Sequence, residues 1–113
     1  MPQIKSDLLS KHCKACKPGT PALNSSQDAA LLKSLDGWAL GDGAISREFK
    51  FKNFYETMAF VNAVAYIANR EDHHPDMEVG YNKCRVKFST HSVGGLSEND
   101  FICAARVDQL LAN

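Results

Sequence analysis

Two short stretches of this chain alternate apolar and polar residues, and helical spacing follows each of them. The first alternation runs from Ile45 to Phe51, and the second runs from Cys84 to Ser89. Alternation divides the side chains of a strand between two faces, whereas apolar residues every three or four positions mark one face of a helix. A chain of 113 residues is long enough for one domain with one core. The pattern therefore predicts strands and helices that share a single core.

Each alternating stretch is predicted to pair with a short strand before it. Residues 38–40 lead into the first stretch through Gly41-Asp42-Gly43, which tolerates positive φ angles. Residues 77–80 lead into the second stretch through Tyr81-Asn82-Lys83. Along the first stretch, Ile45, Phe49 and Phe51 would share the core face with the stem of Arg47. The chain is therefore expected to form two β-hairpins.

The helical spacing predicts three helices. They should run from Ser25 or Ser26 to about Gly37, from Asn53 to about Glu71, and from Ser97 onward. Ser97 and Asp100 resemble a capping box, with Asp in place of the usual Glu. We expect the second helix to be the centre of the core, with a stripe that begins at Phe54. The last helix should bury Phe101, Ala104, Val107, Leu110 and Leu111.

The element order is thus α-β-β-α-β-β-α. Two hairpins must join into one sheet, and amphipathic helices must cover one of its faces. We expect an α+β two-layer sandwich, in which helices pack on one face of a four-stranded antiparallel sheet. A second subunit could bury the other face or an edge of that sheet.

The first 24 residues lack this periodicity and are predicted to be a flexible arm rather than a core element, before a single domain over residues 25–113. The arm contains a C-x-x-C motif, Cys13 to Cys16. A zinc site would need a second ligand pair, and Cys84 and Cys103 are far apart in sequence. A thioredoxin-like site would need a strand before the motif. We favour two ordinary thiols, with zinc binding as the alternative.

Composition excludes several classes of partner. Lys and Arg total 13, as do Asp and Glu, so the formal net charge is zero. Duplex DNA and anionic membranes both attract a positive field, so neither is expected as a main partner. The sequence has no apolar run of membrane-spanning length and no apolar stretch of a secretion signal near Met1. A cytoplasmic location with reduced thiols is the expectation.

Three of the four histidines fall in the C-terminal half: His73, His74 and His91. The first two precede the second hairpin and the third follows it, so antiparallel pairing would bring all three rings towards one pocket. Pro75 ends the preceding helix. Glu71 and Asp72 flank the pair and could orient an imidazole, while Asp100 begins the last helix near the same end.

Three interpretations of this cluster remain open. Three imidazoles could hold zinc with one open position, although adjacent histidines in an extended chain project differently. Two imidazoles could act on opposite sides of a substrate, one accepting a proton and the other donating one. The rings could also be surface histidines satisfied by backbone or water. Because a hairpin gathers them, we favour acid/base chemistry.

Four segments between His73 and Asp100 form a longer signature: His73-His74-Pro75-Asp76, Tyr81-Asn82-Lys83, Ser89-Thr90-His91, and Gly95-Leu96-Ser97-Glu98-Asn99-Asp100. This signature resembles that of the pterin-4a-carbinolamine dehydratases, and its spacing fits without a gap. The resemblance covers most of the chain from about Leu31, and the arm is similar to that of some bacterial members.

This resemblance implies a function. Members dehydrate 4a-hydroxytetrahydropterin, the product of an aromatic amino-acid hydroxylase, to quinonoid dihydropterin and water, and need no metal or organic cofactor. The catalytic residues would be His73, His74 and His91, and the substrate contacts would be Asp72, His73, His74, Ser89, Thr90, His91 and Ser92. Glu71, Pro75 and Asp100 would support them. We expect His74 and His91 to transfer protons and His73 to bind substrate, in a homodimer or homotetramer.

Two positions depart from the family pattern. Met77 stands where many members carry a bulky aromatic residue, and Asn99 stands where an arginine often precedes the aspartate. These changes bear on substrate fit more than on reaction type. The alternative function is a non-catalytic pterin-binding or interaction module, which partners a hydroxylase, a molybdopterin-linked protein or a transcription factor.

Overall fold

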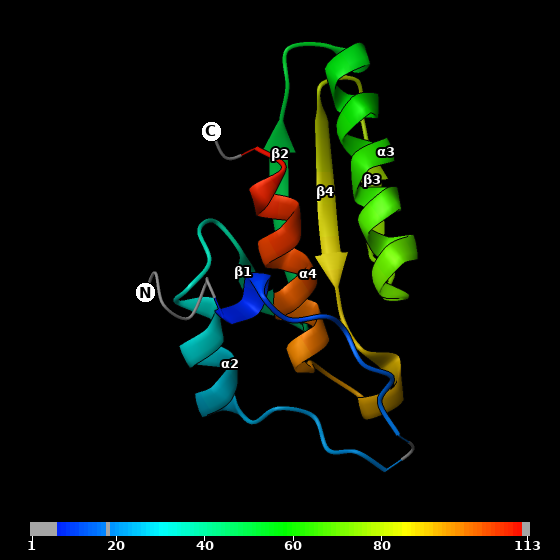
Figure 1. Cartoon of the computed structure of the whole chain (residues 1–113). Coiled ribbons are helices and arrows are strands. Elements are labelled where there is room, and N and C mark those ends of the chain that lie inside the picture. The colour runs from blue at the N-terminus through cyan, green and yellow to red at the C-terminus, as the bar shows by residue number, and fades with distance from the viewer. Residues whose placement is uncertain (1–6, 18, 112–113) are drawn as a thin grey trace.

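The strands and helices follow the predicted order in the computed structural model, which describes residues 7–17 and 19–111 (Figure 1). The strands are β1 (Ala39–Gly41), β2 (Ala44–Lys50), β3 (Asp76–Val79) and β4 (Lys83–Phe88), and the predicted α-helices are α2 (Ser25–Leu32), α3 (Phe54–Glu71) and α4 (Glu98–Gln109). A short 3-10 helix that was not predicted, η1 (His91–Val93), lies between β4 and α4. The sheet has the order β1-β2-β4-β3, and every neighbouring pair is antiparallel. The predicted α+β fold is confirmed.

The alternation along the strands separates a covered face of the sheet from a charged one. In β4, Cys84, Val86 and Phe88 are buried, and the residues between them are exposed. The register places Phe49 of β2 opposite Cys84 and Ile45 opposite Phe88, so the apolar side chains of both strands share one face. Helices α3 and α4 lie next to each other and pack against this face (Figure 1).

The turn between β1 and β2 has the predicted geometry. Asp42 and Gly43 both have positive φ angles, of 53° and 70°. Such angles match the twist of two paired strands, and Asp and Gly adopt them at low cost. The register of the first hairpin follows from this turn, with Gly41 opposite Ala44.

Helix α2 begins slightly earlier than predicted and ends well before the predicted position. Its N-cap is Asn24, not Ser25 or Ser26, and Asn24 and Gln27 bond each other's backbone amides. The helix ends at Leu32 rather than near Gly37. The Ser34 hydroxyl donates to the Leu31 carbonyl at 2.6 Å. A serine that bonds a nearby carbonyl competes with the helical pattern, which explains the early end.

Helix α4, not α3, is the centre of the core. Residues 99–105 of α4 are all buried, whereas Phe54 at the start of α3 is 49% exposed. Helix α4 is covered on several sides, by the sheet, by α3 and by the N-terminal segment, so small residues such as Ala104 are buried all round. The predicted burial of Leu110 and Leu111 is wrong, because α4 ends before them and both side chains are exposed. Within residues 7–17 and 19–111, none of the helices has the length and apolar character needed to cross a membrane.

A buried carboxylate ties the first hairpin to the end of α4. Asp108 accepts hydrogen bonds from the Trp38 indole at 2.9 Å and from the Arg47 guanidinium at 2.9 Å. The Arg47 guanidinium also lies 4.5 Å from the centre of the Phe49 ring. Arg47 therefore lies on the core face, as predicted, and its charge is met by a carboxylate.

The N-terminal segment packs on the domain, so the expectation that it has no core role needs correction. Leu8 is only 1% exposed and belongs to the core cluster. Residues 11–16, which we call the strap, then cross the start of α4 (Figure 1). Asn99 accepts from the Lys14 amide at 3.0 Å and donates to its carbonyl at 2.7 Å. The side chain at a position that departs from the family pattern thus pairs with the strap backbone.

Glu71, at the end of α3, holds the strap from the other side. Its carboxylate accepts from the Cys13 amide at 2.8 Å and lies 2.9 Å from Nδ1 of His12 and 3.8 Å from Nε of Arg106. Burial alone would raise the pKa of Glu71, but these three partners outweigh it and hold the pKa below its ordinary value. The strap is therefore bound to a charged carboxylate.

This pairing predicts a pH dependence of stability. The pKa of Glu71 is lower in the folded chain, so its contribution is complete above the ordinary value of 4.5 and disappears as pH falls through the folded pKa. Near neutral pH, Glu71→Gln should lower the free energy of unfolding by about 1–3 kcal/mol. Denaturant unfolding from pH 7 to pH 3 should show this difference shrinking below about pH 4.5.

The control is Glu78→Gln, which makes the same change at an exposed residue of β3. It should alter the free energy of unfolding by less than about 0.5 kcal/mol. A Glu71→Gln effect that stays constant down to pH 3 would show that the charge of Glu71 does not hold the strap.

Candidate functional site

The second hairpin brings the predicted site residues to one end of the sheet. Asp76 lies opposite Lys87, so the residues just before β3 are close to those just after β4. Asp72 caps the C-terminal end of α3, and its φ angle of 52° lies in the left-handed region that aspartate tolerates. The His73 amide donates to the Ala68 carbonyl and closes the helix end. Pro75, half-buried, then leads into β3.

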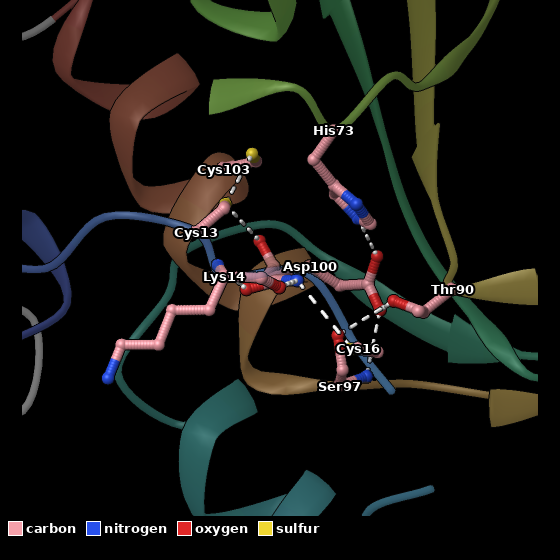
Figure 2. Close-up of polar contacts among 9 residues, drawn as sticks. Cys13, Lys14, Cys16, His73, Thr90, Ser97, Asp100 and Cys103 are labelled. Carbon is pink, nitrogen blue, oxygen red and sulfur yellow. Dashed lines mark hydrogen bonds and ion pairs between the residues drawn. The ribbon is translucent and has the colours of Figure 1, made fainter. Parts of the chain in front are cut away.

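The buried carboxylate of Asp100 organises this end of the sheet (Figure 2). Its Oδ1 lies 2.6 Å from Nε2 of His73. Its Oδ2 accepts from the Thr90 hydroxyl at 2.7 Å and from the Ser97 amide at 2.9 Å. Ser97 and Asp100 also form the predicted capping box of α4. One carboxylate therefore joins the end of α3, the end of β4 and the start of α4.

Asp100 determines how His73 presents its ring. A carboxylate only accepts hydrogen bonds, so Nε2 of His73 carries a proton and the neutral ring keeps its lone pair on Nδ1. The ring also stacks on Phe88, with centres 6.0 Å apart and planes within 10°. The His73 side chain is 12% exposed. It is thus oriented by two contacts while part of it stays accessible.

His73 lines a polar hollow of about 480 Å³ under the strap. Of the predicted substrate-binding residues, Asp72, Thr90 and Ser92 line the same hollow. The strap forms another wall, with Cys13 to Cys16, and Arg70, Glu71 and Asn99 complete the lining. This volume suits a small molecule with several polar atoms.

His91 lines a second hollow, of about 330 Å³, on the other side of Thr90. Ser89 lines this second hollow too, with Asp76, Lys87 and Asp42. Thr90 lines both hollows. The single pocket expected for the three rings is therefore divided in two at Thr90.

His74 and Glu71 have other neighbours than predicted. His74 is exposed, and its Nε2 lies 3.2 Å from Oδ1 of Asn69, a residue of α3. Glu71 contacts the strap rather than orienting either histidine of the pair. Glu71 thus supports the site in two ways: it lines the hollow that contains His73, and it holds the strap that forms the opposite wall.

Sequence reasoning missed the strap as part of the site. The C-x-x-C motif marked these residues as unusual, but the contacts of Cys13 and Lys14 join positions more than 80 apart in the chain. Within residues 7–17 and 19–111, no three side chains of His, Cys, Asp or Glu are grouped as a metal ion would require.

Comparisons with known proteins point to one family. Residues 21–110 match the family described as Pterin 4 alpha carbinolamine dehydratase. A Nitrosomonas eutropha protein named as a pterin-4-alpha-carbinolamine dehydratase is 61% identical over 106 residues, covering 93% of this chain and 94% of that protein. A Legionella pneumophila protein of the same name is 59% identical over 113 residues, covering 97% and 100%.

Two solved structures have a fold similar to that of this chain. The crystal structure of a transcriptional coactivator/pterin dehydratase from Brucella melitensis has a TM-score of 0.76 and 35% identity, covering 80% of this chain and 99% of that one. A pterin dehydratase-like protein identified as a RuBisCO assembly factor has a TM-score of 0.56 and 22% identity, which is a likeness of fold alone. The family match and the close relatives each extend over most of the chain. The chain therefore belongs to the pterin-4-alpha-carbinolamine dehydratase family.

Proposed function

We propose that the protein dehydrates 4a-hydroxytetrahydropterin to quinonoid dihydropterin and water, by histidine general acid/base catalysis. The observation that carries the proposal is the contact between His73 and the buried Asp100 at the edge of a polar hollow. Membership of the dehydratase family supports the substrate class. The enzyme would be a hydro-lyase.

The reaction needs two proton transfers. The hydroxyl on C4a leaves as water when an acid protonates its oxygen, and a base removes the proton from N5. Imidazole suits both tasks, because its unperturbed pKa lies near neutral pH. Such transfers typically accelerate a reaction by about 10²–10⁴-fold each.

His73 is proposed to bind the pterin and to stabilise the charge that develops on it. Asp100 and Phe88 hold its ring in one orientation, which reduces the entropy lost when substrate binds. The Nε2 proton is directed at Asp100, so this ring is better suited to holding substrate than to exchanging that proton.

His74 and His91 are proposed as the acid/base pair. Both are exposed, so each can recover or release a proton to water after turnover. They lie near opposite strands of the hairpin, before β3 and after β4, which allows them to approach different sides of a bound ring. Asp72, Ser89, Thr90 and Ser92 would supply the remaining polar contacts.

The proposal also covers the cofactors, the location and the oligomeric state of the enzyme. It would act without a metal or organic cofactor in the cytoplasm, and would return pterin to an aromatic amino-acid hydroxylase. A homodimer or homotetramer is expected, since β1 and β3 are open edges of the sheet and Val79 on β3 is 44% exposed.

The direct test is a dehydratase assay. A hydroxylase generates the carbinolamine, and the decay of its ultraviolet absorbance is timed with and without the protein. His74→Ala and His91→Ala should each lower kcat by about 10²–10⁴-fold, while His73→Ala should mainly raise KM. Far-UV circular dichroism checks that each variant is folded.

The control is Tyr55→Ala, which removes a ring at an exposed position of α3 that lines neither hollow. It should leave kcat close to the wild-type value. No acceleration by the wild-type protein over the spontaneous reaction would contradict the function, and near-native rates for both His74→Ala and His91→Ala would contradict the roles.

Asp100→Asn separates the binding role of this residue from its role as a cap. The change keeps the shape of the side chain but removes the charge that His73 faces. A hydrogen bond to a charged group is worth about 1.5–3 kcal/mol, so KM should rise about 10- to 100-fold, with a smaller change in kcat.

Asn53→Ala is the matched control, because it removes the N-cap at the other end of α3 and leaves the contact between His73 and Asp100 in place. It should cost about 1 kcal/mol in the free energy of unfolding without moving KM. Equal changes of KM in the two variants would mean that Asp100 acts only through the fold.

A further inference from the structure

The C-x-x-C motif has no part in the proposed dehydration, yet its first cysteine has a specific partner. Sγ of Cys13 lies 3.5 Å from Sγ of Cys103, which is fully buried in α4 (Figure 2). The second cysteine of the motif, Cys16, instead lies 3.8 Å from the Asn99 side-chain amide. The spatial pair is therefore Cys13 with Cys103, across 90 positions of the chain.

The polar contacts of the two thiols indicate which acceptor each S–H faces. Cys13 donates its S–H to the Asn99 carbonyl at 3.6 Å, so the S–H of Cys103 is the one that points to Cys13. This hydrogen bond and burial raise the pKa of the Cys103 thiol, which stays protonated. Cys13 is only partly buried and lines the hollow under the strap, so it is the thiol that a small oxidant can reach.

We propose that Cys13 and Cys103 are an oxidation site, at which a hydroperoxide closes a disulfide between the strap and α4. A disulfide bond is about 2.05 Å long, so the sulfurs need to approach by about 1.5 Å. A movement of the strap or a rotation of the Cys13 side chain would have to supply that distance. The proposal does not depend on the dehydratase reaction.

The chemistry balances with hydrogen peroxide as the oxidant. Cys13 first loses its proton to solvent, its thiolate attacks one peroxide oxygen, and the O–O bond breaks to give sulfenic acid and hydroxide. The hydroxide takes up the proton that Cys13 lost and becomes the first water. The sulfur of Cys103 then attacks the sulfenic sulfur, the S–O bond breaks, and water leaves with the Cys103 proton. The two thiols lose two electrons in total, and the peroxide becomes two molecules of water.

A disulfide between Cys13 and Cys103 would affect the hollow that contains His73. Cys103 lies on α4 three residues after Asp100, and Cys13 lies on the wall that faces His73. A disulfide would bind that wall covalently to the helix that orients His73. Asn99 and Glu71 hold the strap only by hydrogen bonds and ion pairs. Oxidation would add a covalent bond that holds the strap in place until a reductant cleaves the disulfide.

The test is a peptide map of the full chain after treatment with hydrogen peroxide and blocking of remaining thiols. Lys14 lies between Cys13 and Cys16, so trypsin places them on different peptides. The expected product links residues 12–14 to residues 88–106, and dithiothreitol releases it. Cys16→Ser, the matched control on the strap, should keep this product, whereas Cys13→Ser and Cys103→Ala should lose it.

Thermal unfolding gives a second readout. The cross-link closes a loop of about 90 residues, so oxidation should raise the Tm by several degrees in the wild type and in Cys16→Ser. It should leave the Tm of Cys13→Ser unchanged. A main product that joins Cys13 to Cys16, or one that joins two chains, would overturn the proposal. These readouts do not use dehydratase activity, so failure of the proposed function would be seen separately.

Discussion

The fold and the candidate site both depend on the buried carboxylate of Asp100. It accepts hydrogen bonds from the amide that begins α4 and from the hydroxyl that follows β4, and it lies against the imidazole that follows α3. A buried carboxylate is costly unless donors surround it, and here three segments supply them. The requirement that these donors meet explains why the ends of α3 and β4 lie beside the start of α4.

A second carboxylate, Glu71, closes the site from the N-terminal side. It binds the strap through the Cys13 amide and His12, and Asn99 pairs with the backbone of Lys14. The hollow that contains His73 exists only because the strap lies in this position. The N-terminal segment thus contributes to the site as well as to the core, where Leu8 is buried.

Sequence patterns predicted the features that depend on neighbours close in the chain. The alternation of Cys84, Val86 and Phe88 and the capping box of α4 were confirmed, since each follows from residues two or three positions apart. The strap was missed because its partners lie 58 or more positions away and carry no periodic signal. The burial of α4 was underestimated for the same reason: small residues such as Ala104 look neutral until several segments cover them.

A crystal structure with a bound dihydropterin tests most directly whether the pterin binds where Asp100 orients His73. We predict that the pterin ring binds at Thr90, between the hollow under the strap and the hollow that His91 lines, with His73 and Thr90 within hydrogen-bonding distance and the contact between His73 and Asp100 retained. A pterin bound away from His73, or a His73 ring turned away from Asp100 in the complex, would contradict the account.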